Sequence, residues 1–163
     1  MKGIIIEGIS TSGKSSVLRH VHKRLQDEMP HSTKLFISEH YTQRMLEHAL
    51  ENNTLNSQMV KRHIDQINIT QYIFVLSKDR LRKHIKRTLT HRNDQWVSYI
   101  EAKGGLDRIV DESMEWQDNL LSLSESLKEV MPTKRLEITN WDYKKVADTI
   151  YNNEYRECSN TIA

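Results

Sequence analysis

The chain has few of the residues that mark secreted, fibrous or membrane proteins. Cys158 is the single cysteine among 163 residues, so no disulfide can form within the chain, and a reducing compartment is expected. Two prolines and five glycines exclude a collagen-like or proline-rich protein. The apolar run after Lys2 is too short for a signal-peptide core, and no segment has the length of a membrane span. These absences predict a cytoplasmic protein without a membrane partner.

The composition is that of a globular domain. Hydrophobic residues make up 37% of the chain and charged residues 28%, and the length is sufficient to bury a core. A formal net charge of +2 gives no indication of nucleic acid as a partner. Eight histidines lack the spacing and the cysteine neighbours of a zinc site. The charge is uneven, however, because residues 77–92 hold seven Lys or Arg and one Asp.

Short apolar runs alternate along the chain with segments of helical periodicity. Strands are expected at 2–7, 34–38, 72–77 and 135–139, and helices at 14–29, over most of 41–70, at 78–103, at 106–127 and after 140. This alternation predicts an α/β fold, a three-layer sandwich in which helices cover both faces of a short parallel sheet. Residues 1–151 are expected to form a single domain, and residues 152–163 a polar C-terminal tail.

The segment between the first strand and the first helix matches G-x-x-x-x-G-K-[ST], the pattern of a phosphate-binding loop. Its glycines allow successive N–H groups to face an anion, Lys14 can reach the β- and γ-phosphates, and the Ser15 hydroxyl can ligate Mg²⁺. The alternative is an ordinary glycine-containing turn at a strand–helix corner. The motif predicts a P-loop NTPase fold with ATP and Mg²⁺ as cofactors. The expected nucleotide contacts are Gly8, Ser10, Thr11, Ser12, Gly13, Lys14, Ser15 and Ser16.

The stretch "IIIEGISTSGKSS" resembles the opening of the thymidylate kinase and deoxynucleoside kinase family. "LFISEH" resembles the second strand of that family, "LRKHIKRTLTHR" its arginine-bearing lid, and "EITN" with "WDYKKVADTI" its final strand and helix. The resemblance implies that Glu39 is an acid of the catalytic site, which orients or deprotonates an acceptor hydroxyl or holds Mg²⁺ through water. It also implies that Lys14, Arg87 and Arg92 act on the transferred phosphate, with a lid at about residues 78–94.

Helical spacing sorts the arginines of the basic segment. Arg80 and Arg87 are seven residues apart and share a face with His84, whereas Arg82 points elsewhere. The alternative to a lid is a solvated basic face that contacts nucleic acid. Trp96, Tyr99 and Trp116 lie at core-like positions of helices and are expected to pack in the interior. Asn140 and Trp141 follow the last strand, where an adenine-contacting loop would lie, and Asn140 is equally suited to cap the last helix.

The chain departs from the family in one element. The family has an apolar strand ending in Asp-Arg between its second strand and the lid, and residues 41–70 are too polar to supply it. Either "YIFVLSKDR" is that strand, with Asp79 as its acid, or the Asp-Arg strand is missing. The arginine-rich helix that follows directly favours the second interpretation. The departure leaves open whether the protein is catalytically competent.

Four functions follow from these patterns. The first is transfer of the γ-phosphoryl group of Mg-ATP to a small-molecule acceptor, with a nucleoside or nucleotide favoured. The second is a regulatory nucleotide-binding ATPase module without kinase activity. A GTPase ranks lower because no N-K-x-D element is present, and a nucleic-acid-binding protein ranks lower because residues 78–92 lack interleaved aromatic residues. The identity of the acceptor and the formation of a homodimer stay open.

Overall fold

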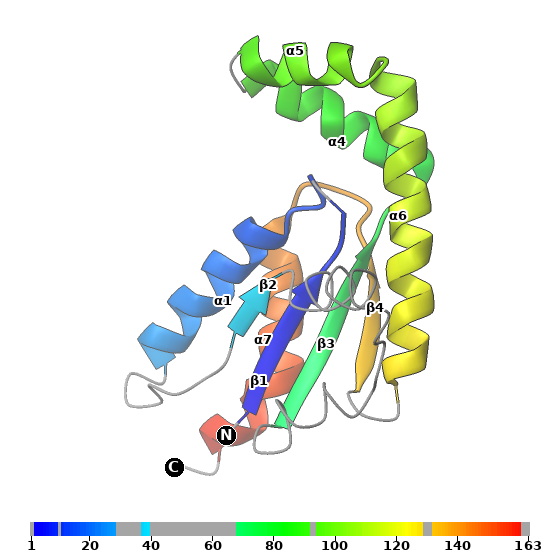
Figure 1. Cartoon of the computed structure of the whole chain (residues 1–163). Coiled ribbons are helices and arrows are strands. Elements are labelled where there is room, and N and C mark those ends of the chain that lie inside the picture. Colours follow the sequence, from blue (N-terminus) through cyan, green and yellow to red (C-terminus); the bar gives the residue numbers. More distant parts are fainter. Residues whose placement is uncertain are drawn as a thin grey trace.

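A computed structural model describes residues 2–9, 11–28, 37–39, 68–91, 94–128 and 132–160 (Figure 1). Its elements are β1 (Lys2–Glu7), α1 (Lys14–Glu28), β2 (Ile37–Glu39), β3 (Asn68–Val75), α4 (Lys78–His91), α5 (Asp94–Ala102), α6 (Leu106–Leu127), β4 (Thr133–Glu137) and α7 (Tyr143–Asn160). No helix within these ranges is both long enough and apolar enough to cross a membrane.

The described strands form one parallel sheet in the order β2-β1-β3-β4. β1 and β3 pair over six residues, from Lys2 opposite Asn68 to Glu7 opposite Ile73. Because the strands are parallel, their carboxyl ends meet at one edge of the sheet. The loop to α1 and the start of α4 both leave from this edge (Figure 1). The sequence-based expectation of an α/β fold with a parallel sheet is confirmed.

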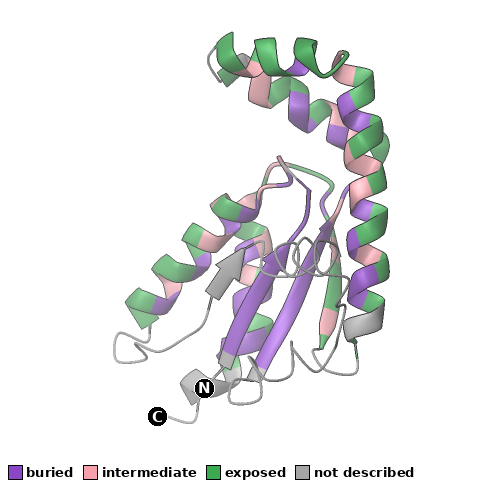
Figure 2. Ribbon diagram, viewed as in Figure 1, coloured by how far each residue is buried: buried purple, intermediate pink, exposed green. Residues whose placement is uncertain are grey.

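The sheet is buried on both faces. Side chains alternate along a strand, so Ile4 and Ile6 point to one face and Ile5 to the other, yet all three have 0% exposure. Figure 2 shows the same burial along β1 and β3. β4 differs, because its Lys134, Arg135 and Glu137 are exposed. Charged side chains of this kind are typical of a strand at a sheet edge.

α1 and α7 pack against one face of the sheet and against each other. α1 buries Val17, Val21 and Leu25, which recur at intervals of four residues and so lie on one side of the helix. Arg24 links the two helices. Its guanidinium lies 3.1 Å from an Asp148 carboxylate oxygen and 4.0 Å from the centre of the Tyr151 ring. The apolar stripe and this ion pair together fix the direction in which α1 leaves the loop.

α4 and α5 lie beyond the carboxyl edge of the sheet, and α6 runs from them down along it (Figure 1). Lys78 and Arg82 of α4 form ion pairs with Asp111 and Asp107 of α6. Gln117 then joins α6 to the end of β3. Its Oε1 accepts a hydrogen bond from the Leu76 N–H at 2.9 Å, and its Nε2 donates to the Leu76 carbonyl at 3.0 Å. α6 therefore holds α4 over the sheet edge.

The sheet topology bears on the question whether "YIFVLSKDR" is the family's Asp-Arg strand. β3 spans Asn68–Val75, not 72–77, and Asp79 lies in the first turn of α4. Asp79 therefore does not end a strand. β2 pairs directly with β1, which leaves no place between them for a further strand. The topology therefore argues against the first interpretation, while residues 40–67, between β2 and β3, lie outside the described part of the chain.

Two other expectations were wrong. α7 continues to Asn160, and both Glu154 and Tyr155 are buried, so residues 152–160 belong to the folded domain instead of a polar tail. The i, i+4 apolar positions of α7 continue into this segment, which the sequence-based boundary overlooked. Tyr99 is 51% exposed on α5 and packs its ring edge against Trp96 instead of entering the core.

The extension of α7 places a carboxylate in the interior. Glu154 is 3% exposed and accepts hydrogen bonds from the hydroxyls of Thr70 and Tyr72. Lys134 lies 3.5 Å from the same carboxylate. Burial, followed by the neighbouring carboxylate, raises the pKa of Tyr72 far above its ordinary value, so the phenol stays protonated and continues to donate. These polar contacts fix α7 across β3.

We predict that Glu154→Ala lowers the free energy of unfolding by about 3 kcal/mol, because it leaves the buried hydroxyls of Thr70 and Tyr72 without their acceptor. Urea denaturation followed by circular dichroism measures this change. Asn152→Ala, at an exposed position of the same helix, is the matched control and is expected to change stability by less than about 0.5 kcal/mol. Equal effects of the two substitutions would contradict the structural role of Glu154.

Candidate functional site

The loop between β1 and α1 has the backbone geometry that its glycines permit. Gly8 has a φ of 156° and Gly13 a φ of 94°. The Ser12 N–H donates to the Ile9 carbonyl at 3.2 Å, and the Val17 N–H donates to the Gly13 carbonyl at 3.0 Å, which starts α1. Thr11 has a φ of 69°, a left-handed conformation that is uncommon for a β-branched residue. The motif therefore lies between a buried strand and a helix, where a phosphate-binding loop belongs.

Both glycines of the motif also lie where a side chain would not fit. A Cβ on Gly13 would lie 2.1 Å from Cε1 of Tyr143, and a Cβ on Gly8 would lie 3.1 Å from Cβ of Phe74. The loop backbone thus packs directly against an aromatic ring of α7 on one side and against β3 on the other. Close packing and positive φ both require glycine at these two positions.

Lys14 begins α1 and turns back over the loop. Its Nζ donates to the Ile9 carbonyl at 2.8 Å, and the residue is 5% exposed. The ammonium group therefore lies on the loop, close to the start of the helix, where N–H groups and the helix dipole also favour an anion. The next residue, Ser15, is exposed in the first helical turn. The loop thus offers an ammonium group, helix-terminal amides and an accessible hydroxyl.

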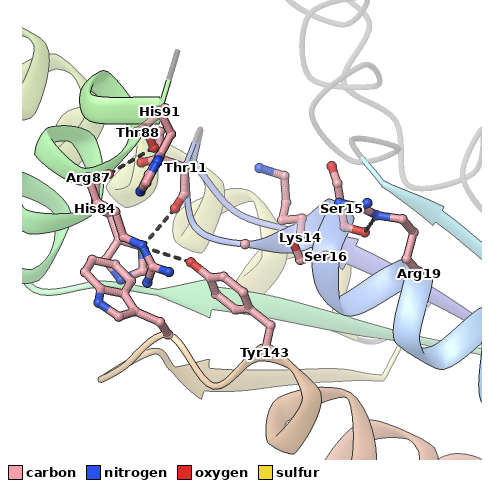
Figure 3. Close-up of a pocket in the computed structure, with 12 residues that line it drawn as sticks. Thr11, Lys14, Ser15, Ser16, Arg19, His84, Arg87, Thr88, His91 and Tyr143 are labelled. Atoms are coloured by element: carbon pink, nitrogen blue, oxygen red, sulfur yellow. Dashed lines mark hydrogen bonds between the residues drawn. The ribbon is translucent and has the colours of Figure 1, made fainter.

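A cavity of about 500 Å³ opens beside the loop (Figure 3). Residues between Thr11 and Arg19 line one side of it. The other side is lined by His84, Arg87, Thr88, His91, Trp141 and Tyr143. Lys14, Arg19 and Arg87 supply positive charge, and none of the lining residues that the structure describes is acidic. A cavity with this charge is suited to bind a polyanion.

Basic side chains of α4 pack around the indole ring of Trp141. The guanidinium of Arg80 lies 4.7 Å from the centre of the indole ring and that of Arg87 lies 4.6 Å from it. The His84 ring is 3.9 Å away, centre to centre. The negative face of an aromatic ring attracts cations, so Trp141 holds two arginines of one helix face in place. The helical spacing in the sequence predicted that Arg80, His84 and Arg87 share a face, and this is confirmed.

His84 connects α4 to the loop. It is 1% exposed, and its Nδ1 donates a hydrogen bond to the Thr11 carbonyl at 2.8 Å. Since a carbonyl can only accept, Nδ1 carries the proton. Burial lowers the pKa of His84, and the charges of Arg80 and Arg87 lower it further, against the opposing effect of the bond to Thr11. The imidazole is therefore neutral at neutral pH.

The structure brings most of the predicted site residues together. Thr11, Gly13, Lys14, Ser15, Ser16 and Arg87 line the cavity, while Gly8 and Ser12 lie in the adjacent part of the loop. Ser10 and Arg92 lie outside the described residues. Glu39 is the last residue of β2 and pairs with Ile6 of β1, so its backbone lies at the same sheet edge as the loop. Its side chain is outside the described part of the chain.

Six lining residues were not predicted as site residues from the sequence. They are Arg19, His84, Thr88, His91, Trp141 and Tyr143. Arg19 lies just over one helical turn beyond Ser15, so the spacing could have indicated it. For Trp141 the signal was its place after the last strand, where an adenine-contacting loop was expected. Tyr143 carries none, because its position depends on how α7 begins. There, Asp142 caps the helix by accepting from the Lys145 N–H at 3.1 Å, whereas Asn140 accepts from the Asp142 N–H at 2.9 Å.

Comparison with known proteins adds no family to this description. No protein-family model matches the chain, and no curated protein matches it significantly. The chemistry of the site therefore rests on its own residues and their geometry. Within the described ranges, no group of three or more His, Cys, Asp or Glu side chains is arranged to hold a metal ion.

We predict that Gly13→Ala destabilises the protein by about 3 kcal/mol or more, since it adds overlap with the Tyr143 ring to the cost of a positive φ. Gly105→Ala separates the two effects. Gly105 has a φ of 99°, but a Cβ there would meet nothing within 4 Å, so its cost is expected to be about 1 kcal/mol. Urea unfolding of the two variants measures the difference, and equal values would show that Tyr143 does not constrain the loop.

The lowered pKa of His84 predicts a pH-dependent stability. The unfolded chain binds a proton at His84 near pH 6.5, whereas the folded protein binds it only at lower pH. The stabilisation is therefore complete above pH 6.5 and is lost as the pH falls through the folded-state pKa. We expect the free energy of unfolding to fall less between pH 7.5 and 5.5 in His84→Asn than in the wild-type protein. Parallel pH profiles of the two proteins would contradict this prediction.

Proposed function

We propose that the protein binds Mg-ATP at the loop of residues 8–15 and transfers the γ-phosphoryl group to a small-molecule acceptor, a nucleoside or nucleotide. The proposal rests on one observation. A loop with the G-x-x-x-x-G-K-[ST] pattern joins a buried parallel strand to a helix, and its lysine lies at a cavity that Arg19 and Arg87 also line. Strand, loop, helix and cavity together are the context in which this motif binds phosphate.

The cavity residues suit the charge of a triphosphate. Lys14 and the N-terminal amides of α1 approach from one side, and Arg87 of α4 approaches from the other. Phosphoryl transfer spreads negative charge over the equatorial oxygens, which positive groups on both sides stabilise. Mg²⁺ prefers oxygen ligands and keeps substrate phosphates and water among them, so it does not require a cluster of carboxylates. The exposed Ser15 hydroxyl fits the role of its protein ligand.

The direct pairing of β2 with β1 supports a role for Glu39. The resemblance to nucleoside and nucleotide kinases implies an acid at the end of the second strand, close to the acceptor, and here β2 lies next to β1 in the sheet. Glu39 ends β2 opposite Ile6, two residues before Gly8. Asp79, the other candidate acid, lies in a helix and does not line the cavity. We assign to Glu39 the orientation of the acceptor hydroxyl or of a Mg²⁺-bound water.

A regulatory ATPase module is the alternative, favoured by the missing Asp-Arg strand. Nucleic-acid binding by the basic helix has less support. Lys78 and Arg82 pair with aspartates of α6, and Arg80 and Arg87 lie on Trp141. Four of the six Lys and Arg side chains of α4 therefore have partners within the protein, which lessens their availability to phosphate backbones.

We predict that Lys14→Ala weakens Mg-ATP binding about 10- to 100-fold, the loss expected for a charge-assisted contact to phosphate. Isothermal titration calorimetry measures the affinity, and a panel of nucleosides and nucleotides incubated with Mg-ATP reveals any phosphorylated product. Arg87→Ala is expected to reduce product formation more than nucleotide binding, because its charge is needed most in the transition state.

Matched controls exist on both helices. Lys23→Ala on α1 and Lys86→Ala on α4 each remove one exposed positive charge from outside the cavity and are expected to leave binding and turnover unchanged. Wild-type affinity in Lys14→Ala would refute the phosphate-binding loop. Tight ATP binding with no acceptor phosphorylated in the panel would favour the regulatory module over the kinase.

A further inference from the structure

A partly buried polar contact joins the loop to α4. His84 donates from Nδ1 to the Thr11 carbonyl at 2.8 Å, across 73 positions of the chain (Figure 3). Thr11 lies in the middle of the loop, and both residues line the cavity. The contact is therefore part of the wall of the site and also connects two elements that are far apart in sequence.

Thr11 has an unfavourable backbone conformation, which the hydrogen bond from His84 helps to stabilise. Its φ of 69° is in the left-handed region, which costs a residue with a Cβ about 1 kcal/mol or more. A β-branched side chain makes that conformation still less favourable. Such a conformation persists when its surroundings impose it. The hydrogen bond from His84 fixes the direction of the Thr11 carbonyl and so imposes the conformation of the peptide that follows it.

His84 is itself held from several sides. Its ring lies 3.9 Å from Trp141, centre to centre, and meets the Tyr143 ring edge-on at 6.4 Å. Thr88 donates from its hydroxyl to the His84 carbonyl at 2.9 Å. Tyr143 also packs on Gly13 of the loop, so the same cluster touches the loop at two positions. His84 thus has little freedom to move independently of the loop.

The same helix carries Arg87, almost one turn beyond His84. Arg87 faces the cavity and lies on Trp141, which also contacts His84. The position of the Arg87 guanidinium relative to the amides of the loop therefore depends on how α4 is attached to the loop. His84 bonds α4 directly to the loop through its side chain.

We infer that His84 is a positioning residue, which fixes the Thr11 peptide of the phosphate-binding loop and sets the distance between that loop and Arg87. The role concerns the nucleotide site of the proposed kinase and rests on that function. His84 acts through its Nδ1–H and the loop backbone, with no contact to the reacting phosphate required. It is neutral and buried, so it contributes geometry to the site instead of charge.

The test compares two substitutions of nearly equal shape. His84→Asn keeps an N–H donor on the atom bonded to Cγ, and His84→Leu removes it. We expect His84→Leu to weaken Mg-ATP binding about fivefold, the factor that one neutral hydrogen bond supplies, and to speed amide hydrogen exchange in residues 11–15. His84→Asn is expected to restore both towards wild-type values. Calorimetry and exchange mass spectrometry measure the two effects, with urea unfolding of each variant to confirm folding.

Each outcome is informative. Equal affinity and equal loop exchange in His84→Asn and His84→Leu, with both proteins folded, would overturn the role of His84. Faster loop exchange in His84→Leu alone supports it even if no variant binds ATP, in which case the proposed kinase function fails and the positioning role stands. If His84→Leu does not fold, the test compares the pyrophosphate affinities of the wild-type protein and His84→Asn. A difference above about fivefold would count against a role that depends on the N–H donor alone.

Discussion

The pairing of β1 with β3 is the constraint on which the site depends. Six residues of each strand are in parallel register, and the pairing ends with Glu7 opposite Ile73. The phosphate-loop pattern begins one residue after Glu7, and α4 begins five residues after Ile73. The two strand ends therefore deliver the loop and the basic helix to the same edge. Burial on both faces, with Ile5 and Phe74 at 0% exposure, makes any slip of this register costly.

Positive side chains lie close together at that edge of the sheet, so their mutual repulsion has to be offset. Lys14, Arg19 and Arg87 line one cavity, and no acidic side chain accompanies them among its described lining residues. Three features reduce their repulsion. Lys14 donates to a backbone carbonyl, the aromatic face of Trp141 accepts Arg80 and Arg87, and His84 stays neutral. A site prepared in this way needs little rearrangement when charge develops on a phosphate, which is the basis of electrostatic preorganisation.

The sequence predicted the helices and strands more accurately than the contacts between them. The strand–loop–helix at residues 2–28 follows from local signals, an apolar run, paired glycines and apolar residues four apart, and the structure has it. The shared face of Arg80, His84 and Arg87 follows from helical geometry. The partner of that face, Trp141, could not be predicted, because it lies 54 residues beyond Arg87 and arrives through the fold of β4 and α7. The sequence-based prediction ended α7 too early. Polar residues such as Asn152 and Asn153 suggested an exposed tail, whereas the next residues, Glu154 and Tyr155, are buried.

The narrow sheet has a chemical consequence on the acceptor side. Neighbouring strands are about 4.8 Å apart, so a strand inserted between β1 and β2 would place the end of β2 about 9.6 Å from β1. Direct pairing instead brings the backbone of Glu39 within one strand spacing of Ile6, close to the start of the loop. In the proposed kinase, an acid at the end of β2 is therefore suited to bind a water of the Mg²⁺ shell or the attacking oxygen, instead of the far end of an acceptor. In the proposed kinase, Glu39 then supplies the acid in place of an Asp-Arg strand, which the described residues do not contain.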